Sequence, residues 1–334
     1  MTGTLRFGLT GDVMLGRLVD ERYRTRDVSE VWGDVRERLR SLDALAINLE
    51  CALSTRGSPW SRTHRPFHFR ADPSWAVPAL TDAGVSFAAL ANNHVLDFEE
   101  PAMRDTLEEL SEAGIAHAGA GRTEGEAFAP ATIEVDGVTI AFVSLTDNTP
   151  EYAVGPDEPG TAYVPIGDDD DLARERAGEA IADANATEPD LLVASLHWGP
   201  NMVTEPPPEF RRFARFLVDE GVDLVHGHSA HVFQGIEVID DVPVLYDCGD
   251  FVDDYAVDHE RRNDRSFLFT ATLESETGSI ETLRLFPTMI ERCTVYRATE
   301  PAASWSRDRM RELSEPFGTS FERDGEELVL DLRG

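Results

Sequence analysis

Val225-His226-Gly227-His228-Ser229-Ala230-His231 follows an apolar run of the chain and places three of its nine histidines within six residues. A fourth, His197, ends another apolar run in the segment Ser195-Leu196-His197-Trp198-Gly199. Short apolar runs of this kind are typical of buried strands, and ligand sites of α/β sheets gather at the carboxyl ends of the strands. Because neutral imidazole is the commonest protein ligand for transition metals, these segments predict a site for one or two metal ions at the edge of a sheet.

The rest of the chain alternates apolar runs with helical patterns, which predicts an α/β layered fold. We expect a hairpin over 132–145 that turns at Asp136-Gly137, and strands at 5–9, 44–48, 85–90, 191–196, 222–226, 242–247, 266–273, 280–286 and 328–332. We expect helices at 31–42, 75–83, 103–113, 169–184, 210–220 and 308–313. The segment 155–171 is rich in Pro, Gly and Asp and reads as a surface loop, so we expect one domain over 1–334. Its core would span about 5–290, with a C-terminal helix and strand in 300–334.

The composition is strongly acidic and excludes several classes of partner. Acidic residues outnumber basic ones 63 to 30, which gives a formal net charge of −33, and every basic residue is Arg. Such a charge argues against nucleic acid as a partner, because phosphate backbones require cationic contacts, and against anionic membranes. The acidic excess and the missing Lys favour a protein of a high-salt cytoplasm, where salt screens self-repulsion. An ordinary acidic protein is the alternative.

Neither the cysteines nor the N-terminus indicates export. The three cysteines, Cys51, Cys248 and Cys293, form no disulfide framework, which favours a reducing interior. Residues 1–10 run directly into a strand without the basic and apolar regions of a signal peptide. Because no apolar stretch approaches the length of a membrane span, we expect a cytoplasmic protein.

Polar donors also follow the strands predicted in the N-terminal half. Asp12 follows the first strand, Glu50 the second, and Asn92-Asn93-His94 the third. Carboxylate and amide oxygens are suitable metal ligands, and His94 could protonate a leaving group as general acid, oriented by Asp97 three residues later. The alternatives are a helix N-cap for Asp12, an Arg-paired loop acid for Glu50 and a structural histidine for His94.

The histidines differ in how strongly the sequence supports them as metal ligands, and the arginines are candidates for binding an anion. His228 and His231 are the stronger candidates as ligands, whereas His226 ends the predicted strand and could instead point into the core. The stretch 62–70 holds three arginines together with His64 and His68, which we do not expect to be metal ligands. This stretch and Arg17 could hold an anionic substrate, or the arginines could neutralise local acids.

The motifs resemble those of the CapA family of poly-γ-glutamate capsule-synthesis proteins, within the calcineurin-like metallophosphoesterase superfamily. The matching segments occur in the family's order between residue 5 and about residue 290: Gly11-Asp12-Val13-Met14-Leu15-Gly16-Arg17, Asn48-Leu49-Glu50, Phe69-Arg70-Ala71, Ala91-Asn92-Asn93-His94-Val95-Leu96-Asp97, Ser195-Leu196-His197-Trp198-Gly199, Gly227-His228-Ser229-Ala230-His231-Val232, Gln234-Gly235-Ile236-Glu237 and Gly249-Asp250-Phe251.

The resemblance implies a four-layer α/β/β/α sandwich with metal ions at the strand ends. By similarity to the superfamily, Glu50 would bridge two ions and His94 would be the proton donor. The other implied ligands are Asp12 and His231 for the first ion, and Asn93, His197 and His228 for the second.

Two residues depart from these patterns. Met14 stands where the superfamily usually has a histidine ligand, a loss shared by the CapA group, and it leaves the first ion one ligand short. Asp250 stands where the CapA family usually has Asn.

Two functions follow as expectations. The first is a metal-dependent phosphoric ester hydrolase using Mn²⁺, Fe or Zn²⁺, in which Arg17 stabilises developing charge and His94 protonates the leaving oxygen. The second is a non-catalytic, metal-containing accessory protein that binds an anionic polymer such as poly-γ-glutamate. A degenerate relative that keeps only the fold is a third reading, disfavoured by the intact histidine set. The sequence leaves open the substrate, the metal and the oligomeric state.

Overall fold

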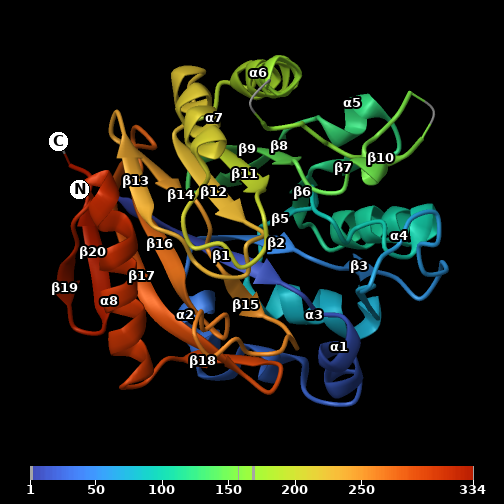
Figure 1. The fold of residues 1–334 in the computed structure, drawn as a ribbon, viewed down its shortest axis with the longest axis horizontal. Coiled ribbons are helices and arrows are strands. Elements are labelled where there is room, and N and C mark those ends of the chain that lie inside the picture. The colour runs from blue at the N-terminus through green and yellow to red at the C-terminus, as the bar shows by residue number, and fades with distance from the viewer. Residues whose placement is uncertain (1–2, 157, 168–169, 334) are drawn as a thin grey trace.

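Two β-sheets packed face to face form the centre of the computed structural model, which describes residues 3–156, 158–167 and 170–333 (Figure 1). The larger sheet has the strand order β19-β20-β17-β16-β1-β2-β5-β6, with β15 paired to β1 and β18 paired to β17. Its strands are β1 Thr4–Val13, β2 Ala44–Leu49, β5 Phe87–Ala89, β6 Ala116–Ala118, β15 Asp250–Val252, β16 Arg265–Glu274, β17 Ile280–Glu291, β18 Thr294–Arg297, β19 Glu322–Asp324 and β20 Glu327–Asp331.

The smaller sheet has the order β13-β14-β12-β11-β9-β8. The strands β9, β11, β12 and β14 run parallel, and β8 and β13 form antiparallel edges. Two short pairs, β3–β4 and β7–β10, lie outside both sheets. The bounds are β8 Ala131–Val135, β9 Val138–Thr146, β11 Leu191–His197, β12 Leu224–His228, β13 Ile236–Ile239, β14 Val242–Leu245, β3 Ala52–Leu53, β4 Arg70–Ala71, β7 Ala120–Gly121 and β10 Gly160–Thr161.

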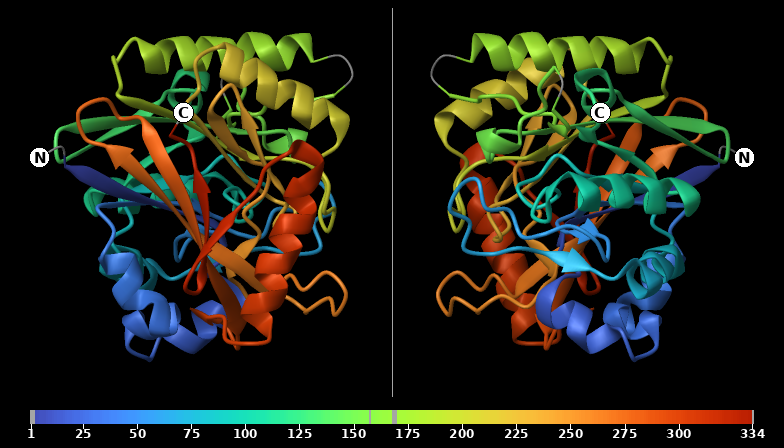
Figure 2. Two further views of the ribbon diagram at one scale, coloured as in Figure 1. Left: turned by 90° about the vertical axis from the view of Figure 1, so that its left-hand side faces the viewer. Right: turned by 90° about the vertical axis from the view of Figure 1, so that its right-hand side faces the viewer.

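Helices cover the outer face of each sheet, so that the molecule has four layers (Figure 2). The larger sheet carries α1 Arg17–Tyr23, the 3₁₀ segment η1 Val28–Val35, α2 Arg36–Arg40, α3 Pro73–Ala83 and α4 Glu99–Glu112. The smaller sheet carries α6 Asp171–Asn185 and α7 Pro208–Asp219, while α8 Ala302–Ser314 packs against β13, β16 and β17. Short helical turns complete the set: α5 Glu124–Ala127, η2 Pro150–Tyr152 and η3 Glu315–Phe317. The predicted α/β class and four-layer sandwich are confirmed.

The two-residue period of the strands decides which side chains face the gap between the sheets. In β11, Leu191 and Val193 belong to the core between the sheets, and Leu192 and Leu196 pack under the outer helices. The same alternation turns His197 toward the opposite sheet, at the carboxyl end of the strand. Each central strand is therefore apolar on both faces and presents one polar end to the gap.

Most predicted elements are present with boundaries shifted by a few residues, and the hairpin turns at Asp136-Gly137, where both residues have positive φ. The single helix expected over 31–42 is wrong, because Gly33 at φ 44° and ψ −133° separates two helical segments. A Cβ atom on Gly33 would lie 2.3 Å from the carbonyl oxygen of Val295, so the break accommodates the approach of β18.

The expectation of a surface loop over 155–171 is wrong for its middle part. Gly160–Thr161 forms β10, and Ala162 and Val164 are fully buried. Residues 157, 168 and 169 of this segment lie outside the described residues. Within the described part of the chain, no helix is long and apolar enough to cross a membrane.

We predict that Gly11→Ala disrupts the pairing of β1 with β15. An added Cβ would lie 1.7 Å from the carbonyl oxygen of Gly249, which accepts the N–H of Asp12 at 2.9 Å. Overpacking of this kind costs about 3 kcal/mol of unfolding free energy, measurable by urea denaturation. Gly125→Ala is the control, because its added Cβ has no atom within 4 Å, and its stability should stay within about 1 kcal/mol of the parent. Equal stability of the two variants would contradict the prediction.

Candidate metal centre

The polar strand ends meet in the gap between the two sheets. In the larger sheet, Asp12 on β1 is paired in register with Asn48 on β2 and with Asp250 on β15. In the smaller sheet, His197 and His228 are paired in register as the last residues of β11 and β12. Parallel pairing places these ends at one edge of each sheet. Segments distant in the sequence therefore contribute side chains to one buried site.

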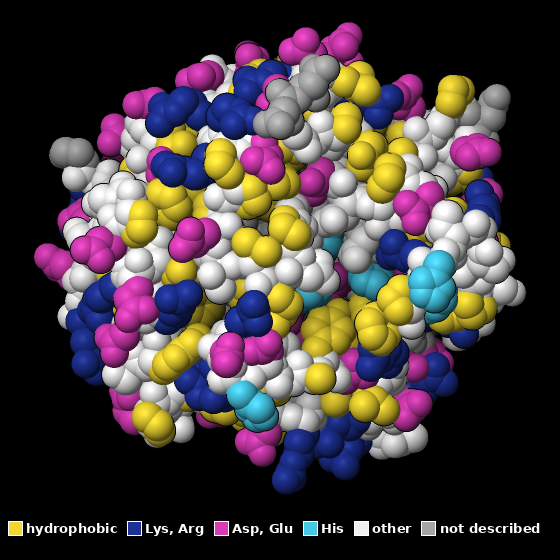
Figure 3. Space-filling view, in the orientation of Figure 1, with side chains coloured by type: hydrophobic (Ala, Val, Ile, Leu, Met, Phe, Trp, Pro, Cys, Tyr) yellow, Lys and Arg dark blue, Asp and Glu magenta, His cyan; other side chains and the backbone are white. Residues whose placement is uncertain are grey.

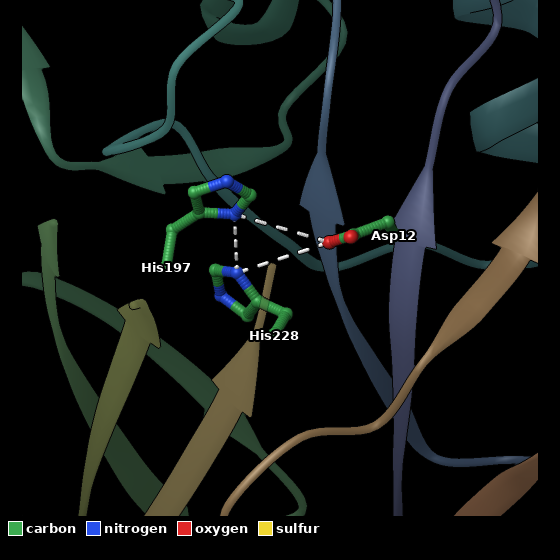
Figure 4. Close-up of side chains that lie close together, drawn as sticks. All are labelled: Asp12, His197 and His228. Atoms are coloured by element: carbon green, nitrogen blue, oxygen red, sulfur yellow. Dashed lines mark hydrogen bonds and ion pairs between the residues drawn. The ribbon is translucent and has the colours of Figure 1, made fainter. Parts of the chain in front are cut away.

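Asp12, His197 and His228 form the first group that could hold a metal ion (Figure 4). The Nδ1 atoms of the two histidines are 3.0 Å apart and lie 4.0 and 3.9 Å from Oδ1 of Asp12. All three side chains are buried. The Nδ2 amide of Asn48 donates to the same Asp12 oxygen at 2.7 Å and fixes its orientation. Two imidazole nitrogens and a carboxylate oxygen thus converge on one point.

Asp12, His231 and Asp250 form a second group of the same kind. Nδ1 of His231 lies 2.8 Å from Oδ1 of Asp250 and 3.3 Å from Oδ2 of Asp12. His231 has φ 59° and Ser229 has φ 113°, so the backbone between β12 and β13 turns sharply to bring the imidazole back toward β1. Asp12 therefore belongs to both groups and uses a different oxygen in each.

Glu50 and Asn93 lie beside these groups. Tyr255 donates its hydroxyl to Oε2 of Glu50 at 3.0 Å, while Oε1 lies 3.8 Å from Nε2 of His94 and 4.0 Å from Nε2 of His197. Oε1 of Glu50, Oδ1 of Asn93, Oδ2 of Asp12 and Oδ2 of Asp250 are buried and have no hydrogen-bond partner of good geometry among the described residues. Buried polar atoms normally have partners, so unpartnered oxygens on the neighbouring Asp12 and Asp250, on Glu50 beside His197, and on Asn93 in the same cavity lining fit a bound cation.

Met14 does not contribute a ligand to either group. Its side chain is fully buried among apolar residues, and its sulfur accepts the backbone N–H of Gly16 at 3.1 Å. Asp250 instead brings a carboxylate to Asp12 and His231. In the sequence, Asp250 stands out only because the CapA family usually has Asn at this position. Asp250 becomes a neighbour of Asp12 through the pairing of β15 with β1, which no local sequence pattern indicates.

Burial and neighbouring charges set the protonation of the site. Burial lowers the pKa of His197 to about 3 and holds that of His228 well below its usual range, so both imidazoles are neutral, the form that binds metals. Burial alone would raise the pKa of Asp12, but the neighbouring His231, whose own pKa is raised, lowers it overall. Burial raises the pKa of Glu50, and the charge of Asp12 raises it further.

His226 lies behind the site and supports His228. Its Nε2 is 2.7 Å from the carbonyl oxygen of Thr10 and its Nδ1 is 3.2 Å from Oγ of Ser195, which lies 3.0 Å from Nε2 of His228. Both ring nitrogens of His226 are thereby occupied, and burial lowers its pKa to about 4. The question left open by the sequence is answered: His226 points into the core and positions a candidate ligand, as residues behind metal ligands commonly do.

His94 is held by an arrangement suited to a proton donor. Its Nδ1 lies 2.5 Å from Oδ2 of Asp97, and its ring stacks on Phe69 at a centroid distance of 3.9 Å. Asp97 is itself fixed by the N–H of Phe69 at 2.7 Å and the hydroxyl of Tyr152 at 3.0 Å. Burial lowers the pKa of His94 and the charge of Asp97 opposes this shift. The remaining nitrogen, Nε2, faces Glu50.

A cavity of about 790 Å³ opens over the site and is lined by Arg17, Arg65, Asn93, His94 and His231, among others. Arg17 forms an ion pair with Asp254 at 3.2 Å. Of the stretch 62–70, only its middle part reaches the cavity: Arg65 is bound to Thr149 and lies 3.8 Å from Asp97. The side chains of His64 and His68 belong to neither metal group.

Comparisons with known proteins agree with these motifs. The family model for the bacterial capsule synthesis protein PGA_cap matches residues 6–255. A probable polyglutamine synthesis accessory protein of Mycobacterium tuberculosis is 32% identical over 93% of this chain and 91% of its own length. The capsule biosynthesis protein CapA of Bacillus anthracis is 26% identical over 91% of this chain and 75% of its own. Among solved structures, purple acid phosphatase PPD1 from yellow lupin seeds matches with a TM-score of 0.38 and 7% identity, over 89% of this chain and 53% of that one.

We predict that Asp247→Ala loosens the segment that carries His228 and His231. The Asp247 carboxylate accepts the N–H groups of Ala230 and Gly249, each at 2.7 Å. Each buried N–H left unpaired costs about 1–3 kcal/mol, so the unfolding free energy should fall by about 2–6 kcal/mol and the histidine NMR resonances should shift.

Asp223→Ala is the matched control, because that carboxylate accepts one N–H, from Leu192 at 2.8 Å, where β11 begins. It should cost about 1–3 kcal/mol and leave the histidine resonances in place. Resonances unchanged by Asp247→Ala would contradict the assigned role.

Proposed function

The chain belongs to the bacterial capsule synthesis protein PGA_cap family, and from this membership and the geometry of the site we propose that it is a metal-dependent phosphoric ester hydrolase. Its reaction would serve the synthesis of poly-γ-glutamate or a related polymer, as the names of its relatives suggest. The observation that carries the proposal is the position of Asp12 in two Asp/His groups, with Glu50 between His197 and His94 at 4.0 and 3.8 Å. A shared carboxylate is the usual way in which two-metal hydrolases fix the spacing of their ions.

Asp12, His197 and His228 would hold one divalent ion, and Asp12, His231 and Asp250 a second. Glu50 and Asn93, each with an unpartnered buried oxygen, would complete the coordination. The distances favour Asp12 as the shared ligand in the place that the resemblance gives to Glu50. Mixed nitrogen and oxygen donors suit Mn²⁺, Fe or Zn²⁺. Such ions would polarise a phosphoryl oxygen and lower the pKa of water.

His94 would act as the general acid. Asp97 holds its Nδ1 and Phe69 holds its ring plane, so that Nε2 alone faces the cavity side of the site. A proton on Nε2 would pass to the oxygen of the leaving group as its bond to phosphorus breaks. Arg17, at the cavity wall, would stabilise negative charge on the phosphoryl group.

The alternative is a non-catalytic accessory protein that binds an anionic polymer. The name of the Mycobacterium tuberculosis relative favours it. The arginines that would bind a polyanion weigh against it, because Arg65 is directed at Asp97 and Thr149, and Arg70 donates to the carbonyl oxygen of Arg56. If polymer binding were the function, oligo-γ-glutamate should bind at high salt, and substitution of Arg65 and Arg70 should weaken that binding.

We predict that His94→Gln lowers kcat for an alkyl phosphate ester by about 10²–10⁴-fold, the usual contribution of a general acid. The loss should be much smaller for p-nitrophenyl phosphate, because nitrophenolate leaves without protonation. Steady-state kinetics with Mn²⁺-loaded protein measures kcat, and elemental analysis measures the metal content of each variant.

His117→Gln is the control, since His117 lies on β6 and its Nδ1 contacts the carbonyl oxygen of Ile115, outside the site. Unchanged turnover of the alkyl ester in His94→Gln would exclude the general-acid role. Lost metal would show instead that His94 supports the ligands.

We predict about two transition-metal ions per chain when the protein is purified in molar salt without chelator or metal-affinity resin. Asp250→Ala should reduce the content to about one, because the second group then retains only Asp12 and His231. Asp147→Asn is the control, because this partly buried carboxyl accepts the N–H of Gly199 and belongs to neither group. One ion or none in the parent protein would contradict the two-ion site and favour the polymer-binding alternative.

A further inference from the structure

Several residues that line the cavity over the candidate metal centre have no role in the proposed hydrolysis. Besides His94 and His231, the cavity lining includes the apolar or aromatic residues Pro66, Phe67, Met202, Tyr255 and Val257. Figure 3 shows histidine side chains at the bottom of a hollow on this face, with hydrophobic and arginine side chains around it. A volume of about 790 Å³ is that of a small-molecule site.

Exposed apolar side chains gather at the mouth of this cavity. Four large hydrophobic residues of the described chain are exposed, and two of them, Phe67 (54% exposed) and Val257 (41%), line the cavity. A third, Leu18, lines an adjoining hollow that shares Tyr255 and Val257 with it. The fourth, Leu172, lies on α6. Exposed apolar residues that cluster in this way mark ligand sites, whereas scattered ones need no explanation.

Two aromatic rings, Phe69 and Phe67, lead from the proposed proton donor His94 to the mouth of the cavity. The Phe69 ring stacks on His94 at 3.9 Å and 28°, and Phe67 lies nearly parallel to Phe69 at 6.3 Å and 21°. The Arg17 guanidinium lies 5.1 Å from the Phe67 ring centre and 5.5 Å from that of Phe69, which holds the two rings together. The outermost ring, Phe67, is half exposed and keeps a surface available for a flat ligand.

The charges of the cavity suit one small anion. Arg17 is paired with Asp254 and Arg65 faces Asp97, so neither arginine contributes a full positive charge to a ligand. A polyanionic chain would meet the carboxylate of Asp258 in the lining and those of Asp254 and Asp97 behind the two arginines, in a protein of net charge −33. An ester with one phosphoryl group avoids that repulsion.

We propose that the ligand of this cavity is a phosphate ester that carries a flat aromatic or heterocyclic ring, with the phosphoryl group at the metal centre and the ring against Phe67. The inference rests on the proposed function for the phosphoryl end, and on the exposed aromatic wall for the ring. In this arrangement Phe67 determines specificity for the ring, and the Arg17 guanidinium positions the Phe67 side chain.

Calorimetry with two non-hydrolysable probes tests the ring independently of catalysis. Benzylphosphonate should bind the Mn²⁺-loaded protein about tenfold more tightly than ethylphosphonate, because an aromatic contact typically contributes that factor. Phe67→Ala should bring the ratio of the two affinities close to one, and Phe67→Tyr should preserve it. Leu172→Ala, which removes an equally exposed apolar side chain from α6, is the control and should leave the ratio unchanged.

Cyclohexylmethylphosphonate and the non-hydrolysable phosphonate analogue of adenosine monophosphate define the ligand further. Weaker binding of the cyclohexyl compound than of the benzyl one supports a flat ring over a merely apolar one. Tighter binding of the adenosine phosphonate than of benzylphosphonate identifies a heterocyclic source of the ring, and the reverse order an aryl source. Equal affinity for benzyl- and ethylphosphonate, a ratio unaffected by Phe67→Ala, or displacement of benzylphosphonate by oligo-γ-glutamate at high salt would overturn the inference.

Hydrolysis of benzyl and ethyl phosphate by the same preparation tests the proposed function separately. Both esters release alkoxides of similar basicity, so a difference in KM reports on the ring and not on the leaving group. Ring-selective binding without hydrolysis of either ester would exclude the hydrolase and leave the ligand assignment standing. Hydrolysis of both esters with equal KM would support the proposed hydrolase activity and exclude a contribution of the ring to substrate binding.

Discussion

The buried charge of Asp12 is the constraint on which the rest of the site depends. An uncompensated carboxylate between two sheets is unfavourable by several kcal/mol, and the described residues surround it with the Asn48 amide and three imidazoles within 4.0 Å. Two of these imidazoles, His197 and His228, are neutral because burial lowers their pKa. Around Asp12, further buried oxygens have no partner of good geometry within the described chain. Against the effect of burial, the carboxylates of Asp250, Glu50 and Asp12 raise the pKa of the third imidazole, His231. His231 therefore supplies one positive charge to a cluster of three carboxyl groups, and a divalent cation would supply the charge that is still missing.

The backbone makes this concentration of polar groups possible. Asp12 and Asp250 become neighbours because β15 pairs with β1, which requires Gly11 to lie against the carbonyl oxygen of Gly249. Asp247 ties the segment after β12 to the segment before β15 through two backbone N–H groups. The ligands therefore lie on strand ends and tethered turns rather than on long loops, which keeps their relative positions fixed without a bound ion.

The local pattern of the sequence predicts which polar residues lie at strand ends, but it does not predict which distant residues contact them. Asp12, Glu50, Asn93, His197 and His228 were found because each closes an apolar run, and parallel strands bring such ends together. The role of Asp250 depends on a pairing between segments about 240 residues apart, which no local pattern records. The break at Gly33 depends on the carbonyl oxygen of Val295, and the hydroxyl of Tyr255 on Glu50. Each of these contacts is long-range, so residue type alone could not predict it.

Replacement of the usual histidine by Met14, with Asp250 beside Asp12 and His231, makes the two halves of the centre chemically unequal. One half has two neutral imidazoles and a shared carboxylate, a donor set that suits Zn²⁺ or Fe. The other has one imidazole and two carboxylates, a harder and more negatively charged set that suits Mn²⁺. Because Asp250 adds negative charge where a histidine would add none, it strengthens the attraction for a cation, while burial opposes its ionisation by raising its pKa. Binding of an ion at this second group would therefore be coupled to the ionisation of Asp250.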